Sequence, residues 1–130
     1  MVLYSGGAIS WFSQRQTVVA TSTTEAEIIA ANECAREAIW LKRLFLSITK
    51  LNGTPTLQVD NTAAIRLAEN PEFHRRTKHI NIKHFFIREK VLEKELLIQQ
   101  VATEHQIADI LTKPVFKPRL LTLCSVIGLY

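Results

Sequence analysis

One long stretch of helical spacing, bounded by strong start and stop signals, constrains the fold of this chain more than any other feature. Thr21-Ser22-Thr23-Thr24 followed by Glu25 and Glu27 has the composition of a helix start, with hydroxyl side chains at the cap and acids in the first turn. Apolar residues then recur at helical spacing to about Ile48. The turn Asn52-Gly53-Thr54-Pro55 ends the segment, so we expect one helix from this cap to about Ile48.

Shorter segments on both sides of this helix alternate between strand and helix patterns. The segments before it are two strands at residues 1–4 and 8–13 around the turn Ser5-Gly6-Gly7, and a β-branched stretch at 16–20 that extends the second strand or crosses back. The segments after it are a strand at 56–59, a helix at 62–68, a basic connector at 72–80, a helix at 82–93, a strand at 96–101, a helix at 104–111 and a helix at 118–130. This order predicts an α/β fold with a mixed sheet flanked by helices.

Length and composition fit one domain spanning residues 1–130. Hydrophobic residues make up 47% and charged residues 22% of the chain, which is ordinary for a soluble globular protein. No apolar run has the length of a membrane span, and the start has no signal-peptide pattern, so we expect no membrane partner and an intracellular location in cytoplasm or nucleus. Cys34 falls on an apolar helical face, which favours a buried free thiol over a disulfide.

The positive charge of the chain is concentrated in one segment. The net charge is +4, and residues 74–90 contain Glu89 as their one acid against nine basic residues. These nine are His74, Arg75, Arg76, Lys78, His79, Lys83, His84, Arg88 and Lys90. Such a segment can contact nucleic-acid phosphates, and the alternative is a solvated charged loop. The histidines recur every five residues, which does not place them on one helical face, so we do not expect a zinc site.

Three acidic residues lie in short motifs where carboxylates can do chemistry. Asp60 ends a short apolar strand, and carboxylates at the carboxyl ends of strands in α/β sheets face the crevice where ligands bind. The alternative is that Asp60 caps the helix that starts near Thr62. Glu27 could serve only the helix dipole. Asp109 lies among apolar residues of a short helix, which solvation explains less well.

Together and in their order along the chain, these motifs resemble the ribonuclease H domain that ends the Pol polyprotein of copia-type (Pseudoviridae-like) retrotransposons. The motifs are Gly6-Gly7-Ala8-Ile9-Ser10-Trp11, Ser22-Thr23-Thr24-Glu25-Ala26-Glu27, Val59-Asp60-Asn61, Arg75-Arg76-Thr77-Lys78-His79-Ile80, Phe86-Ile87-Arg88-Glu89-Lys90 and Ala108-Asp109-Ile110-Leu111-Thr112-Lys113-Pro114. The resemblance covers essentially the whole chain. It implies a ribonuclease H-like fold.

The resemblance also implies a chemistry and a substrate. Members of that family hydrolyse the RNA strand of an RNA–DNA hybrid with two Mg²⁺ or Mn²⁺ ions held by four carboxylates. In this chain Glu27, Asp60 and Asp109 would be the catalytic metal ligands, with Glu25 as the fallback at the helix start. The nucleic-acid contacts would come from Arg75, Arg76, Lys78, His79, Lys83 and Arg88.

The chain departs from the family at its beginning. The family's domain opens with a central strand that carries the first catalytic aspartate, whereas this sequence starts inside the next strand and resembles an N-terminally truncated copy. We therefore expect impaired activity in the isolated chain and unpaired strand edges. Three hypotheses stay open: a nuclease completed by a strand-supplying partner, an inactive nucleic-acid-binding module, and a protein-interaction module that self-associates as a homodimer.

Overall fold

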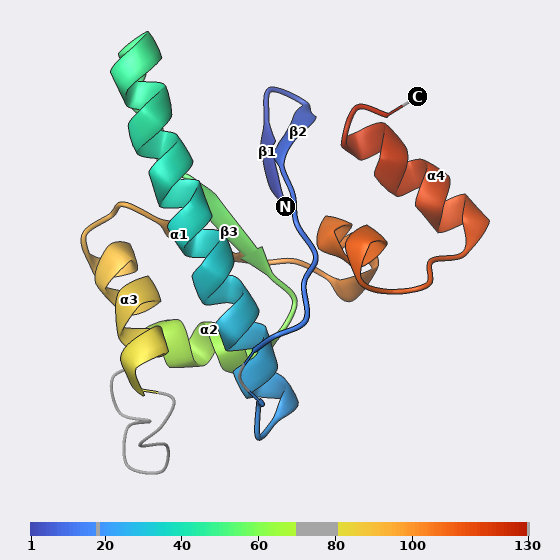
Figure 1. The fold of residues 1–130 in the computed structure, drawn as a ribbon, viewed down its shortest axis with the longest axis horizontal. Coiled ribbons are helices and arrows are strands. Elements are labelled where there is room, and N and C mark those ends of the chain that lie inside the picture. Colours follow the sequence, from blue (N-terminus) through green and yellow to red (C-terminus); the bar gives the residue numbers. More distant parts are fainter. Residues whose placement is uncertain (18, 70–80, 130) are drawn as a thin grey trace. The chain divides into compact units, whose positions relative to one another are not determined.

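The computed structural model describes residues 1–17, 19–69 and 81–129 (Figure 1). The backbone divides into two compact units. One consists of Met1–Val19 together with Thr103–Tyr130, and the other is the continuous stretch Ala20–Ala102. The single domain over residues 1–130 stays a prediction. Within the described ranges, no helix is both long and apolar enough to cross a membrane.

The longest element of the continuous unit is helix α1, Thr23–Thr49, which confirms the predicted helix. Its start is a reciprocal cap. The Ser22 side chain accepts a hydrogen bond from the backbone N–H of Glu25 at 3.1 Å, and the Glu25 carboxylate accepts from the N–H and the hydroxyl of Thr21, both at 2.6 Å. The first bond satisfies a donor that the first helical turn leaves without a partner, and the other two join that turn to the residue before the cap. At the other end Lys50 adopts a left-handed conformation, and its N–H donates to the carbonyl of Leu46.

Strands β3 (Thr56–Val59) and β4 (Leu97–Gln100) form a parallel pair with Leu57 opposite Ile98. The chain between them contains helices α2 (Thr62–Glu69) and α3 (Asn81–Leu92), as the sequence pattern predicts. Beyond the strands the pairing continues, because the Leu97 N–H donates to the carbonyl of Pro55 and the Val101 N–H donates to that of Val59.

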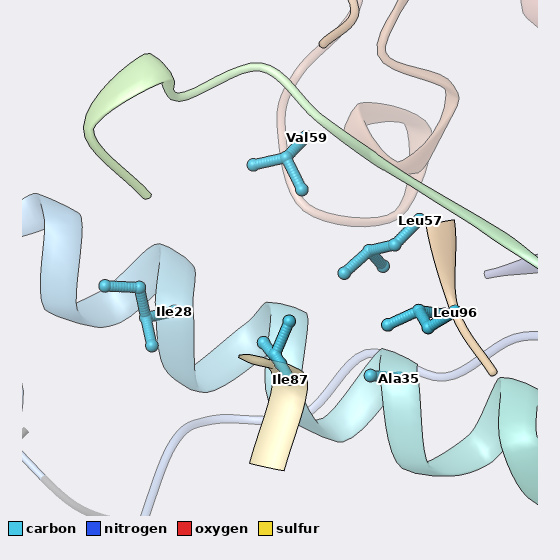
Figure 2. Close-up of a cluster of buried hydrophobic side chains, with 6 residues drawn as sticks. All are labelled: Ile28, Ala35, Leu57, Val59, Ile87 and Leu96. Atoms are coloured by element: carbon cyan, nitrogen blue, oxygen red, sulfur yellow. The ribbon is translucent and has the colours of Figure 1, made fainter. Parts of the chain in front are cut away.

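The core of this unit is a cluster in which side chains from four parts of the chain point toward one another (Figure 2). The cluster consists of Ile28, Ala35, Leu57, Val59, Ile87 and Leu96. β3 alternates between exposed and buried residues, as expected for a strand with one face on a core. Cys34 packs against this cluster as a free thiol, as predicted, and burial raises its pKa.

The turn from α3 into β4 is organised by Lys90. Its ammonium lies 2.6 Å from the Glu93 carboxylate and 3.3 Å from that of Glu95, and its carbonyl accepts from the N–H groups of Glu95 and Leu96. Leu96, which is fully buried, is thereby placed in the core. The nearby Lys90 ammonium lowers the pKa of Glu95, and the hydrogen bond to Glu93 raises the pKa of Lys90.

The second unit combines an N-terminal hairpin with the C-terminal segments. Strands β1 (Val2–Tyr4) and β2 (Gly7–Ser10) pair antiparallel around Ser5 and Gly6, which both have positive φ, as in a type I′ turn. Helix α4, Lys117–Val126, follows two short 3₁₀ helices, η2 (Thr103–His105) and η3 (Ile107–Leu111). The end of the chain meets the hairpin, because the Ala8 N–H donates to the carbonyl of Ile127 at 3.3 Å.

Several predicted elements differ from the structure. The second strand ends at Ser10 rather than at residue 13, and the described residues of 16–20 form no strand. The helix predicted over 104–111 is instead η2 and η3, separated by Gln106. A physical reason is that the Arg119 side chain donates to the carbonyls of Thr103 and Glu104, which a continuous α-helix would use for its own bonds.

The strand pairing agrees with a mixed α/β class but not with one sheet. The described strands form two separate two-stranded sheets, β1 with β2 and β3 with β4. No strand in the described ranges pairs with both sheets, so the single mixed sheet is not formed by these strands alone. The basic connector predicted at 72–80 lies outside the described residues.

We expect replacement of Lys90 by Met to lower the midpoint of thermal unfolding by a few degrees at neutral pH. Because the pKa of Glu95 is lowered on folding, its contribution is present above its unfolded pKa and is lost as pH falls through the folded value. The variant should therefore show a weaker loss of stability as the pH falls below the ordinary pKa of a glutamate. Thermal melts across this range measure it, with Lys94→Met, an exposed neighbour, as control. Equal acid dependence in the Lys90 variant and the wild type would contradict the interpretation.

Gly128 lies at the C-terminal end of α4 with φ +81°, and a Cβ there would lie 3.1 Å from the carbonyl oxygen of Gly6. We expect Gly128→Ala to lower the free energy of unfolding by about 1–2 kcal/mol, because alanine is strained at this φ and would push against the hairpin. Urea denaturation measures the change. Gly53→Ala is the matched control, since a Cβ at Gly53 meets no atom within 4 Å. The idea fails if both variants lose the same stability.

Candidate functional site

The three predicted carboxylates are distributed over both units. Glu27 and Asp60 belong to the unit Ala20–Ala102. Glu27 lies in α1, and Asp60 directly follows β3. Asp109 belongs to the other unit, inside η3. Each carboxylate therefore has its own local surroundings, which decide what it can do.

Asp60 directly follows β3 and is half-buried. The cap of α2 is made by its neighbour. The Asn61 side-chain oxygen accepts from the N–H of Ala63 at 2.9 Å, and the Asn61 carbonyl accepts from the N–H of Ile65 at 3.2 Å. The alternative in which Asp60 caps α2 is therefore wrong. Asp60 stands instead at the carboxyl end of a parallel strand, the position where α/β sheets bind ligands.

Glu27 is exposed and lies two residues beyond Glu25 on α1. Residues two apart on a helix do not face each other, so these two glutamates project to different sides. Glu25 is the acidic residue of the first turn, and its carboxylate is bound to Thr21 in the cap. Glu25, the fallback ligand, therefore takes part in the cap that starts the helix.

Asp109 is buried, with 4% of its surface exposed, which agrees with the predicted position near the buried side. Its carboxylate contacts two cations. The Lys113 ammonium lies 2.8 Å from one oxygen, Oδ1, and the Arg119 guanidinium lies 3.0 Å from the other, Oδ2. Two positive partners compensate the cost of burying this charge. Its backbone carbonyl also accepts from the N–H groups of Thr112 and Lys113.

The donor chemistry for Mg²⁺ or Mn²⁺ is present, but the geometry fits only in part. Carboxylate oxygens are the ligands these ions prefer, which suits Glu27 and Asp60. Asp109 does not fit as the structure has it, because each of its oxygens already lies within hydrogen-bond distance of a cation. Across the described ranges, no group of three or more His, Cys, Asp or Glu side chains is arranged to hold a metal ion.

The predicted nucleic-acid contacts lie mostly outside the described residues. These are Arg75, Arg76, Lys78 and His79. Lys83 lies in the first turn of α3, and Arg88 lies further along the same helix with its side chain partly exposed. α3 is held to α1 in part by Arg36, whose guanidinium lies 5.4 Å from the centre of the Phe86 ring.

Sequence reasoning gave no role to the two residues that hold Asp109. Lys113 had a local signal, because a lysine four residues after an aspartate can pair with it on a helical segment. Arg119 had none, since it lies ten residues from Asp109 on another element, and only the folding of α4 brings it there.

The sequence is similar along nearly its whole length to a segment of transposon polyproteins. It is 40% identical over 127 residues, 98% of the chain, to the retrovirus-related Pol polyprotein from transposon TNT 1-94 of Nicotiana tabacum. It is 38% identical over 121 residues, 92% of the chain, to that from transposon RE1 of Arabidopsis thaliana. Similarity extends to the transposon Ty1-DR5 Gag-Pol polyprotein of Saccharomyces cerevisiae, at 31% identity over 113 residues and 86% of the chain.

The match covers a small part of each relative. The chain spans 10%, 8% and 6% of the lengths of these three polyproteins. No family model matches the chain, and no solved structure matches it.

The cap geometry predicts that substitutions at two neighbouring residues differ in their effect on stability. We expect Asn61→Ala to lower the free energy of unfolding by about 1 kcal/mol, because α2 loses its side-chain cap. Asp60→Asn should change it by less than about 0.5 kcal/mol, since Asp60 is not the cap. Chemical denaturation of both variants measures this. A loss for Asp60→Asn as large as that for Asn61→Ala would mean that Asp60 has a structural role.

Proposed function

Because the chain belongs to the Pol-derived sequences of copia-type retrotransposons, we propose that it is a ribonuclease H-like domain. Its reaction would be hydrolysis of the RNA strand of an RNA–DNA hybrid, impaired in the isolated chain. The chain covers a tenth or less of its relatives, so this activity is a proposal for this segment alone.

One observation supports the site more than the others: Asp60 stands at the carboxyl end of β3 without serving as the cap of α2. β3 packs through Leu57 and Val59 onto α1, the helix that carries Glu27. Both carboxylates are thus attached to elements held together by one core. A bound Mg²⁺ or Mn²⁺ would supply activation of water and neutralise charge at the scissile phosphate.

Two features support impaired hydrolysis. The chain contains only two aspartates, and one of them, Asp109, is bound by Lys113 and Arg119. Catalysis by paired metal ions depends on their exact placement, so a shortage of available carboxylates costs rate. The two separate strand pairs are consistent with this, because a ribonuclease H-like sheet would join them through a central strand. We propose that a partner, either a second copy or another part of a Pol polyprotein, supplies that strand.

The basic segment 74–90 supports an RNA–DNA hybrid or another nucleic acid as the ligand. Its lysines and arginines outnumber its single acid, Glu89, and Arg88 is carried by α3, which packs on the core through Ile87. Contacts to phosphates provide affinity without sequence preference. Binding of this kind does not require the metal site to be complete.

A second candidate function, a self-associating interaction module, is favoured by the last third of α1. All the buried residues of α1 lie between Ile28 and Ile39, and the helix continues past the core (Figure 1). Beyond that point Trp40, Leu44 and Ile48 recur every four residues on one face and are 57%, 42% and 72% exposed. A contiguous exposed apolar stripe is typical of a binding surface.

The test is cleavage of a labelled RNA–DNA hybrid with Mg²⁺ and then Mn²⁺, together with hybrid binding by fluorescence anisotropy. We expect little or no cleavage and no change on Asp60→Asn. Binding should weaken about tenfold between about 50 and 200 mM salt even if only about two phosphates are contacted. If the chain cleaves the hybrid and Asp60→Asn abolishes that cleavage, the expectation of impaired hydrolysis is wrong and the metal site does assemble.

The same samples separate the second candidate. Light scattering gives the mass of the chain and of Trp40→Ala. A salt-insensitive dimer that dissociates in Trp40→Ala, with no hybrid binding, would replace the ribonuclease H-like proposal by the interaction module. The control variant is Thr49→Ala, which changes an exposed, polar position near the end of α1. Leu41→Ala is not a suitable control, because Leu41 is partly buried.

A further inference from the structure

The surroundings of Asp109 point to a role other than metal binding. We propose that Asp109 is a structural tie in this chain, which joins η3 to α4 through Arg119, and that Lys113 or Arg119 must release its carboxylate before a divalent ion can bind there. The metal part of this proposal rests on the proposed function, whereas the structural part does not.

The Asp109 carboxylate is a buried charge. The Asp109 side chain is 6% exposed, and an ionised carboxylate at such a position needs partners to offset its lost hydration. Lys113 is a local partner, four residues away, with a side chain that is 51% exposed and an ammonium 2.8 Å from Oδ1. Arg119 is the long-range partner, with a side chain that is 34% exposed.

The Arg119 side chain makes three hydrogen bonds, one to η3 and two to η2. Its Nη2 donates to Asp109 Oδ2 at 3.0 Å and to the carbonyl of Thr103 at 2.7 Å, and its Nε donates to the carbonyl of Glu104 at 3.2 Å. One guanidinium from α4 thus binds η2 and η3 together. This depends on the planar arrangement of donors in arginine, which lysine does not have.

A divalent ion would compete with Lys113 and Arg119 for the Asp109 carboxylate. Both oxygens of Asp109 are occupied, Oδ1 by Lys113 at 2.8 Å and Oδ2 by Arg119 at 3.0 Å. A divalent ion at this carboxylate would face two positive charges at similar distances, so it binds only if at least one of them moves away. When Arg119 moves, α4 loses its side-chain link to η2 and η3. Metal binding at Oδ2 of Asp109 and the docking of α4 through Arg119 therefore oppose each other.

The structural part is tested by a double-mutant cycle in the full chain. We expect Asp109→Asn and Arg119→Gln each to lower the midpoint of thermal unfolding by about 5 °C or more. The double variant should lose clearly less stability than the sum of the two single losses, because both changes remove the Asp109–Arg119 contact. Arg119→Lys, which keeps the charge but not the planar donors, should recover less than half of the loss. Effects that simply add in the double variant would overturn the tie.

The competition is tested with Mn²⁺ alone, by its paramagnetic broadening of the NMR signals of the Thr112 and Lys113 amides, which donate to the Asp109 carbonyl. We expect broadening in Arg119→Gln at a Mn²⁺ concentration about tenfold lower than in the wild type. The broadening should disappear in the double variant, which combines Arg119→Gln with Asp109→Asn and so lacks the carboxylate. If Arg119→Gln does not fold, Lys113→Gln carries the comparison.

Equal broadening in the wild type and in Arg119→Gln would overturn the competition. Neither readout uses the hybrid, so loss of hybrid binding or of cleavage would bear on the proposed function and leave this proposal standing.

Discussion

The packing of α1 on β3 is the interaction on which the rest of the continuous unit depends. Ile28 and Ala35 from the helix meet Leu57 and Val59 from the strand, and Ile87 and Leu96 complete the cluster (Figure 2). A four-residue strand and a two-stranded parallel sheet have little stability by themselves, so this burial is what holds them in register. It also gives Glu27 and Asp60 a common rigid support, although neither carboxylate takes part in the core.

In the other unit the comparable constraint is electrostatic. Arg119 of α4 binds Asp109 of η3 and the carbonyl of Thr103 in η2, which provides a directed link between these elements. The buried Asp109 carboxylate has a cation beside each of its oxygens, and a carboxylate paired in this way is less able to bind a metal ion. The contacts of Asp109 in this structure tie η3 to α4, and under the proposed function the same side chain would also be a metal ligand.

Local sequence patterns predicted the elements well where the stabilising contacts are themselves local. The cap from Ser22 to Glu25, the apolar spacing of α1, the turn around Gly6 and the strand ending at Val59 all depend on residues within four positions of one another. The site was predicted less completely. Asp60 was singled out, but its release from a capping role depended on which of two adjacent side chains accepts the Ala63 N–H, and that side chain belongs to Asn61.

What the sequence by itself determined is therefore the order and kind of the elements, the long capped helix, and the relationship to transposon Pol polyproteins. Only the tertiary structure decided that residues 103–111 form two 3₁₀ helices, that the four described strands pair as two separate sheets, and that Asp109 is held by Arg119. The physical reason is distance along the chain. A helix cap or a tight turn is encoded within a few residues, whereas a guanidinium from α4 reaches the carbonyls of Thr103 and Glu104 only after the chain has folded back on itself.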